Sequence, residues 1–176
     1  MVSRFCGSNA ENLLLEINWN EHEWVKNAIE ILKKTVPQYS SVCLAGTCLA
    51  VHRLKLTDDV LWATLQREAF KCVNTINPKG LAAFMLTFLE VPERCSKDFK
   101  LKLMEQLPRK IKNMNPGCIT KIFELTIKNG LLTEYLFEDH FYLLFWRRNV
   151  WFGPKCYPSI LKSFVEINHS VRWSHY

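Results

Sequence analysis

The chain has 176 residues, of which 48% are apolar and 23% are charged. This length suits a single domain over residues 1–176 with a continuous core, and this composition excludes a chain that is disordered throughout. The formal net charge is +6, and residues 96–128 carry most of it, with eight basic and three acidic side chains. Such a stretch is typical of a surface that binds a polyanion, although a solvated lysine-rich helix face gives the same pattern.

The N-terminal part predicts an incomplete first unit over residues 9–34. A short apolar helix is expected over residues 9–18. Asn20 is the expected N-cap of the next helix, because Glu23 follows three residues later and can reach back to the Asn20 amide. That helix is expected to end at a lysine pair, which is favourable at a helix C-terminus.

Prolines are predicted to mark the later units. Pro37, Pro78, Pro116 and Pro154 are spaced by 41, 38 and 38 residues, and proline suits the first turn of a helix because its missing amide would have no partner there. Each unit is therefore predicted to be a proline-started helix, a linker and a Ser/Thr-capped helix. The expected caps are Thr57, Ser96 and Thr133. The expected unit boundaries are 35–75, 76–113 and 114–151, followed by a half-unit at 152–168 and a polar, aromatic tail at 169–176.

Core positions recur in the same register. The predicted core residues after the prolines are Cys43, Leu44, Phe84, Met85, Ile122, Phe123, Ile160 and Leu161, and those after the caps are Val60, Leu65, Phe99, Met104, Leu136 and Phe141. Within the capped helix expected over 97–112, Pro108 predicts a kink or an early break near 104–108. The pattern predicts an all-α fold, a short right-handed solenoid of helix-turn-helix repeats of about 38 residues, with an irregular helical bundle as the alternative.

Cysteines and apolar runs favour a reduced compartment and no membrane insertion. The odd number of cysteines, with no C-x-x-C and no Cys/His cluster at zinc spacing, predicts buried reduced thiols, no metal and no cofactor. No apolar run reaches the roughly 18 residues that a membrane span needs. The seven cysteines are Cys6, Cys43, Cys48, Cys72, Cys95, Cys118 and Cys156.

The two central units carry a phrase that resembles a known family. Ile76-Asn77-Pro78 recurs as Met114-Asn115-Pro116, and each phrase precedes an apolar helical pattern such as residues 81–86. In this respect residues 35–168 resemble the roughly 38-residue helical repeats of FAST-kinase-like and RAP-domain proteins, including the octotricopeptide and heptatricopeptide classes. The resemblance implies an organellar protein that binds RNA along a superhelical surface, or that scaffolds a ribonucleoprotein such as the mitochondrial ribosome. This chain has fewer units than the longer members and no recognisable RAP domain, which favours a resident subunit of a large assembly.

Candidate RNA contacts follow from the basic residues, because flexible cations along a track contact phosphates without reading sequence. Arg147 and Arg148 lie between Trp146 and Trp151, a combination that stacks on unpaired bases or anchors a protein interface. The candidate RNA-binding residues are Lys97, Lys100, Lys102, Arg109, Lys110, Lys112, Lys121, Lys128, Arg147 and Arg148. The candidate protein-interface residues are Trp146, Trp151, Trp173 and Tyr176.

No residue set indicates catalysis. The five histidines are dispersed, and no nucleophile–histidine arrangement or glycine-rich phosphate loop is present. We expect a non-enzymatic protein of the mitochondrial matrix, with the plastid or cytoplasm as alternatives. Its expected partners are rRNA or other organellar RNA and neighbouring proteins of a large assembly. The leading hypothesis is a structural component of the mitochondrial ribosome; the alternatives are a protein-binding scaffold or accessory subunit of a mitochondrial membrane complex, and a stand-alone RNA-processing factor.

Overall fold

The computed structural model describes residues 18–148 and 151–170, which form helices and turns and contain no β-strand. The prediction of an all-α fold is confirmed; the helix expected over 9–18 lies outside the described residues except for its last residue. The α-helices are α2 (Glu23–Thr35), α3 (Ser41–Arg53), α4 (Asp59–Cys72), α5 (Pro78–Glu90), α6 (Lys97–Lys110), α7 (Pro116–Lys128), α8 (Glu134–Leu136), α9 (Leu143–Arg147) and α10 (Tyr157–Ser170). A π-helical segment, η5 (Phe137–Tyr142), joins α8 to α9. Short 3-10 turns are η1 (Trp19–Glu21), η2 (Val36–Gln38), η3 (Pro92–Arg94) and η4 (Ile111–Asn113).

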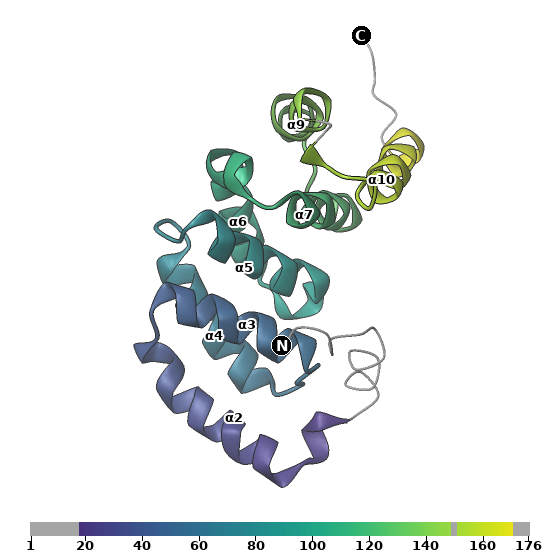
Figure 1. Ribbon diagram of the computed structural model, residues 1–176. Helices are drawn as coiled ribbons and strands as arrows, with labels where there is room; N and C mark the ends of the chain where they lie inside the picture. The colour runs from purple at the N-terminus through teal and green to yellow at the C-terminus, as the bar shows by residue number, and fades with distance from the viewer. Residues whose placement is uncertain (1–17, 149–150, 171–176) are drawn as a thin grey trace, which may run out of the picture.

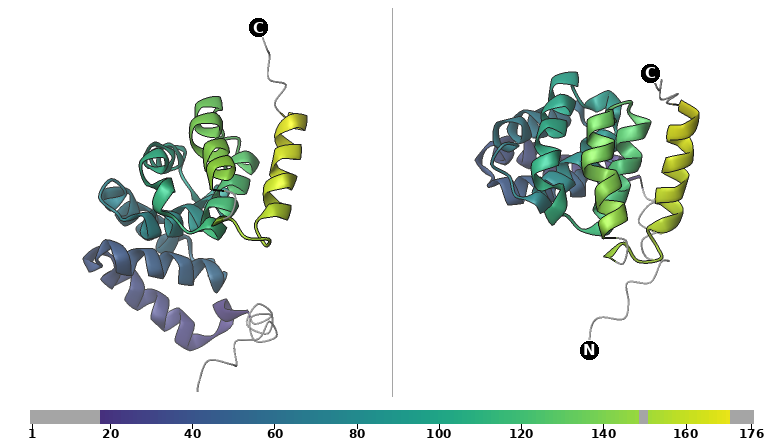
Figure 2. Two further views of the ribbon diagram at one scale, coloured as in Figure 1. Left: turned by 45° about the horizontal axis from the view of Figure 1, so that its top comes forward. Right: turned by 90° about the horizontal axis from the view of Figure 1, so that it is seen from above.

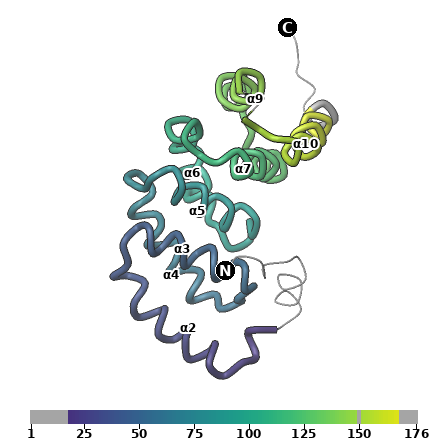
Figure 3. The backbone as a smooth tube through the Cα atoms, viewed as in Figure 1, coloured from purple at the N-terminus to yellow at the C-terminus, as the bar shows by residue number. Residues whose placement is uncertain are grey.

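The helices follow one another in chain order from α2 at one end to α10 at the other (Figures 1 and 3). In one layer, α3 contacts α5, α5 contacts α7, and α7 contacts α10. In the other layer, α2 contacts α4 and α4 contacts α6, while α3–α4 and α5–α6 contacts join the layers. Two further views, one of them from above, show the same succession of helices (Figure 2).

Helix starts in the two central units were predicted correctly. Pro78 and Pro116 are the first residues of α5 and α7. The asparagine before each proline accepts a hydrogen bond from a first-turn amide, so the repeated Asn-Pro phrase is a helix cap followed by a favourable first residue. Ser96 and Thr133 cap α6 and α8 through their hydroxyls, as expected.

The proline register was wrong in the outer units. Pro37 lies in η2, and α3 begins only after Ser40, whose hydroxyl accepts a hydrogen bond from a first-turn amide. Pro154 lies in a turn before α10. Of the core positions counted from these prolines, Leu44 and Ile160 are buried as predicted, whereas Cys43 is exposed and Leu161 is 63% exposed.

Two predicted N-caps, Asn20 and Thr57, bond to each other instead of capping helices. The Asn20 side-chain oxygen accepts hydrogen bonds from the Thr57 amide at 2.9 Å and its hydroxyl at 3.2 Å. Asp58 caps α4, accepting from the Leu61 amide at 2.7 Å. The cap therefore lies one residue later than predicted, which leaves Val60 exposed and buries Leu61.

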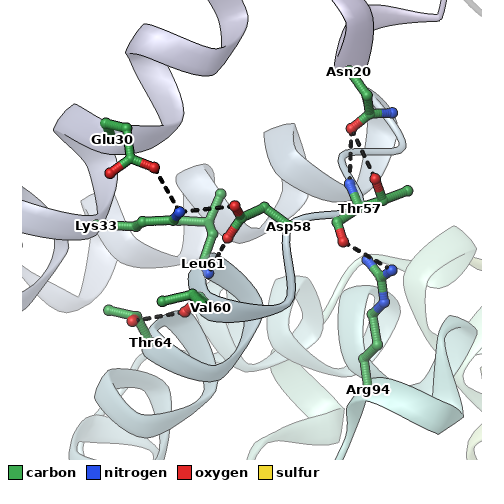
Figure 4. A network of polar contacts seen from close by, with 9 residues as sticks. All are labelled: Asn20, Glu30, Lys33, Thr57, Asp58, Val60, Leu61, Thr64 and Arg94. Carbon is green, nitrogen blue, oxygen red and sulfur yellow. Dashed lines mark hydrogen bonds and ion pairs between the residues drawn. The ribbon is translucent and has the colours of Figure 1, made fainter.

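A polar network ties the start of α4 to the units on either side (Figure 4). The Lys33 ammonium lies 2.8 Å from the Asp58 carboxylate and joins α2 to α4. On the other side, Arg94 of η3 donates a hydrogen bond to the Thr57 carbonyl oxygen at 3.2 Å. Lys33 and Asp58 are both partly shielded from solvent, so this pair fixes α2 against α4 more firmly than a fully exposed pair would.

Hydrogen bonds between neighbouring units connect residues that lie a similar distance apart in the sequence. Most of them are made by a side chain that donates to a backbone carbonyl near the end of the preceding helix. They join Arg94 to Leu56 (38 residues apart), Lys110 to Val73 (37), Asn129 to Leu89 (40) and Arg148 to Lys112 (36). A shorter connection, 30 residues, joins the Ser96 amide to Gln66.

The early break expected in α6 does not occur. The helix continues through Pro108 to Lys110, and only then tightens into η4. Lys112 lies in η4, past the end of α6, whereas the sequence placed it on a helix over 97–112.

The η5 segment contains one residue more than the corresponding parts of α4 and α6. Seven residues after the N-caps of α4 and α6 come Leu65 and Leu103, both fully buried. Seven residues after Thr133 comes His140, and the buried residue is instead Phe141, at eight. A π-helical turn has one residue more per hydrogen-bonded ring than an α-helical turn, so it restores the core at Phe141. His140 thus occupies a position that is core in the other units.

The expectation of buried cysteines is only partly correct. Cys48 and Cys95 are buried, and burial raises the pKa of Cys95 to about 11, so its thiol stays protonated at neutral pH. Cys43, in the first turn of α3, is exposed. The remaining described cysteines, Cys72, Cys118 and Cys156, are partly buried and free, and Cys6 lies outside the described residues.

Close packing at the start of α5 makes Gly80 difficult to replace. A methyl group on Gly80 would lie 2.5 Å from both Cγ1 and Cδ1 of buried Ile76. We expect Gly80→Ala to lower the free energy of unfolding by about 1–3 kcal/mol, measured by urea denaturation. The control is Gly46→Ala, which has no atom within 4 Å inside α3 and should stabilise by about 0.5–1 kcal/mol. Equal changes in the free energy of unfolding for the two variants would contradict close packing of Gly80 against Ile76.

Candidate nucleic-acid interface

Three predicted phosphate-binding side chains meet between the ends of α6 and α9. Lys112 follows α6 in η4, and Arg147 and Arg148 lie at the C-terminal end of α9. All three line one cavity of about 170 Å³. Asp139 is the single acidic residue in its lining. With His140 neutral, the lining therefore carries three positive charges and one negative charge. The remaining lining residues are Ile111, His140, Leu143 and Leu144.

Arg148 is held in place by two contacts. Its guanidinium donates to the Lys112 carbonyl oxygen at 3.2 Å, which joins the end of α9 to the turn after α6. It also lies 5.5 Å from the centre of the Trp151 ring, in cation–π geometry. The main chain after α6 and the indole of Trp151 therefore fix this charge at the cavity.

Two exposed indoles occur at this end of α9, and that of Trp151 lies against Arg148. Trp146 is 72% exposed and its ring stacks on Tyr142, with centroids 6.3 Å apart and planes 13° apart. Trp151 is 40% exposed. Neither indole is core, so both present apolar faces to a base or a partner protein. Trp173 and Tyr176, the other expected interface residues, lie outside the described residues.

Lys110 has a structural role. Its ammonium donates to the carbonyl oxygens of Val73 and Asn74, at 3.3 and 3.1 Å, and so satisfies the open end of α4. Burial lowers the pKa of Lys110. Because these bonds occupy the ammonium, we leave Lys110 out of the phosphate-binding set.

This role predicts a stability effect for Lys110. Replacing it with glutamine should lower the free energy of unfolding by about 1–2 kcal/mol, because charge-assisted bonds to two carbonyls are lost. Chemical denaturation of the variant tests this. Exposed Lys128→Gln is the matched control, with an expected change within about 0.5 kcal/mol. A stable Lys110→Gln protein with weakened RNA binding would reverse the assignment.

The other predicted cations do not join the cavity. Lys102 is 3.8 Å from Glu105, and Lys121 is 3.3 Å from Glu124. Lys97 and Lys100 lie in the first turn of α6, and Lys128 lies at the end of α7 in the other layer. Exposed Arg109 lies in the last turn of α6 and borders a neighbouring groove together with Tyr135. We call Arg109, Lys112, Arg147 and Arg148 the α6/α9 basic cluster; within the described chain, none of the four forms an ion pair.

His140 is a part of the site that the sequence pattern did not reveal. Both of its ring nitrogens are buried and have no hydrogen-bond partner in the described part of the chain. Its ring lies edge-to-face with Tyr135, with centroids 5.1 Å apart. The sequence expectation for a lone histidine was a structural or solvated role. The signal that identifies it is its register, seven residues after Thr133, where the corresponding helices α4 and α6 carry leucine.

The burial of His140 predicts a pH-dependent stability. Burial lowers its pKa from the ordinary value of 6.5, with Asp139 opposing and Lys112 adding to the shift. Between the lowered folded pKa and the unfolded pKa, the unfolded chain binds more protons, so stability is complete above about pH 6.5 and falls below it.

Thermal unfolding at about pH 5.5 and pH 7.5 measures this effect. The wild type should lose more stability at the lower pH than His140→Phe, which cannot take up the proton. Identical losses in the two proteins would contradict a neutral imidazole with buried nitrogens.

No protein-family model and no curated protein matches this sequence. Functional assignment therefore rests on the site itself. Among the described side chains, residues 18–148 and 151–167, no three His, Cys, Asp or Glu are placed to hold a metal ion. In the same part of the chain, no helix has the length and apolarity to cross a membrane.

Proposed function

We propose that the protein is a non-enzymatic, RNA-associated helical-repeat protein that contacts RNA phosphates through the α6/α9 basic cluster. The observation that carries this proposal is the meeting of Lys112, Arg147 and Arg148 at one cavity with a single acidic residue. Three cations with a single acidic residue among them repel one another, and a polyanion relieves that repulsion. The exposed indoles of Trp146 and Trp151 add surfaces on which unpaired bases stack.

The repeat architecture is part of the proposal. We infer a short right-handed solenoid of units of about 38 residues. Support comes from the two layers of helices in chain order and from the hydrogen bonds that join residues 36–40 apart. The right-handed sense remains a prediction.

The proposed setting is the mitochondrial matrix, where the protein would serve as a resident component of the mitochondrial ribosome and contact rRNA. Support comes from the repeated phrases Ile76-Asn77-Pro78 and Met114-Asn115-Pro116, which resemble the organellar repeat family. In both, the asparagine caps the helix that the proline begins. The small number of units favours a subunit held by many neighbours over a factor that reads RNA alone.

A protein-binding scaffold, such as an accessory subunit of a mitochondrial membrane complex, is the second candidate. Tyr157, Leu161 and Val165 lie four residues apart on α10 and are 40%, 63% and 55% exposed. Residues at this spacing share one helix face, so α10 presents an apolar stripe at the end of the helix stack. A partner that continues the stack would cover it.

Binding of single-stranded RNA across a salt series tests the proposed function. We expect log K to fall linearly with log salt, with a slope of about −0.7 for each neutralised phosphate, hence about −2 to −3 for the cluster. Sedimentation of the native protein with ribosomal particles then tests the setting. A protein with no salt-dependent RNA binding, which migrates instead with a membrane complex, would support the scaffold and contradict RNA association.

A further inference from the structure

The groove between the C-terminal half of α6 and the start of α8 contains an amide without a partner. Gln106 lines this groove and is only 6% exposed, yet its side chain forms no hydrogen bond within the described chain. Among the described side chains, the N and O atoms that are both unbonded and closed to solvent belong to Thr87 and His140. Solvent therefore reaches the polar atoms of the Gln106 amide, and so can a ligand in the groove.

The corresponding position of the preceding capped helix is satisfied within the protein. Glu68 comes ten residues after the N-cap of α4, as Gln106 comes ten residues after the N-cap of α6. Glu68 is 8% exposed, and its carboxylate lies 2.8 Å from the Lys71 ammonium and 3.0 Å from Nε of Arg67. A largely buried amide costs free energy unless it is hydrogen-bonded, so packing alone does not explain the glutamine in α6.

The surroundings of the amide suit a flat ligand with apolar faces. The ring of Tyr135 borders the groove and is 60% exposed. An edge-to-face contact with His140, with centroids 5.1 Å apart, holds this ring in place. The groove measures about 510 Å³, within the range of about 300–1,000 Å³ that is usual for small-ligand sites. Its apolar lining residues are Met104, Pro108, Leu131 and Leu136.

The charges at the rim indicate a ligand that also carries a negative group. Arg109 follows Gln106 by three residues, so the two lie on one face of α6. Arg109 is exposed and forms no ion pair in the described chain. Glu105, the acidic residue of the lining, lies 3.8 Å from the Lys102 ammonium, which offsets its charge.

A nucleotide combines these features. Its base has apolar faces and a hydrogen-bonding edge, and its phosphate is negative. The amide of glutamine presents an acceptor and a donor side by side, and this arrangement pairs bidentately with adenine, whose amino group donates and whose adjacent ring nitrogen accepts. Gln106 therefore favours adenine among the bases.

We propose that the α6–α8 groove binds one unpaired adenine base, with Gln106 hydrogen-bonded to its edge, Tyr135 stacked on its face and Arg109 at the adjoining phosphate. As a base of RNA, this ligand rests on the proposed function; as a free adenine nucleotide, it does not. Lys112 lines the neighbouring cavity, so an RNA strand that leaves the groove past Arg109 meets the rest of the α6/α9 basic cluster.

Titration with adenosine 5′-monophosphate, followed by the ¹⁵N–¹H signals of the glutamine side chains, tests the groove without RNA. We expect a saturable shift of the Gln106 signal and about tenfold weaker binding in Gln106→Leu, which removes the amide and keeps a side chain of similar size. Gln66, whose amide oxygen already accepts a hydrogen bond from the Ser96 amide at 2.8 Å, is the internal reference and should not shift. An unshifted Gln106, or unchanged binding in Gln106→Leu, would overturn the proposal.

Tyr135 offers a second variant at an exposed position, where the change does not endanger the core. Tyr135→Ala should bind adenosine 5′-monophosphate about tenfold more weakly, because it loses the stacking surface. Tyr135→Phe keeps the ring and is the matched control, with binding equal to that of the wild type. Equal binding by Tyr135→Ala and the wild type would contradict a base in this groove.

Single-stranded RNA distinguishes a base of RNA from a free nucleotide. Oligoadenylate and oligouridylate of one length are compared in the wild type and in Gln106→Leu. We expect the wild type to prefer oligoadenylate about tenfold and the variant to lose this preference. Salt-dependent RNA binding without any preference, and with no nucleotide shift at Gln106, contradicts the base site and leaves the proposed function standing. Nucleotide binding without RNA binding supports the groove site and contradicts the proposed function.

Discussion

Replacing Phe123 with alanine is expected to lower the free energy of unfolding by about 3–5 kcal/mol. Phe123 is fully buried in α7, and its ring centroid lies 4.7 Å from that of Phe141, 5.1 Å from Phe145 and 5.8 Å from Phe164. These rings come from η5, α9 and α10, so one side chain joins three elements to α7. Its removal leaves a cavity that rigid neighbours cannot fill.

The loss should be concentrated at the C-terminal end. In a repeat array each unit contacts only its neighbours, so hydrogen exchange of Phe123→Ala should rise in α9 and α10 and remain low in α4. Phe70→Ala is the matched control because Phe70 is 42% exposed, and it should cost less than half as much. A uniform rise in exchange across all helices would contradict a stack of separately supported units.

Reversing three charges of the α6/α9 basic cluster is expected to weaken RNA binding at least ~100-fold at low salt. The variant combines Arg109→Glu, Lys112→Glu and Arg147→Glu, three exposed residues without ion pairs in the described chain. Three favourable phosphate contacts become repulsive, and fewer counterions are released on binding. Fluorescence anisotropy with a labelled single-stranded RNA measures the effect.

A second triple variant controls for net charge. Lys26→Glu, Lys34→Glu and Lys79→Glu change the charge by the same amount at exposed positions on α2 and α5. Measured at the same salt as the cluster variant, this variant should lose less than ~10-fold in RNA affinity, because its charges lie outside the proposed contact. An equal loss in both triples would show that overall charge, rather than the cluster, attracts RNA.

The central helices were predictable because their signals are local. Asn77 and Asn115 each cap a helix that starts at the following proline, so cap and first residue agree in the sequence. At Pro37 and Pro154 the same residue type lies in a turn, and the helix begins later. Proline suits a turn as well as a first helical position, and only the packing of the following helix separates the two cases.

The candidate site was predictable in its residue types but not in its arrangement. Lys112, Arg147 and Arg148 were each identified from charge, yet their meeting depends on a hydrogen bond between residues 36 apart. Lys110 belongs to the same charged stretch, and only the structure shows that carbonyls of the preceding unit occupy it. His140 was missed because a one-residue insertion moves it out of the core register, an effect that a constant helical period does not describe.

Photo-crosslinking of single-stranded RNA containing 4-thiouridine, followed by peptide mapping, tests RNA contact at the α6/α9 basic cluster most directly. We predict cross-links in the peptides that carry Trp146, Trp151 and Arg109, with a loss of most of them in the charge-reversed triple. Cross-links confined to α3 and α5, or cross-links that the charge-reversed triple retains in full, would contradict RNA contact at the α6/α9 basic cluster.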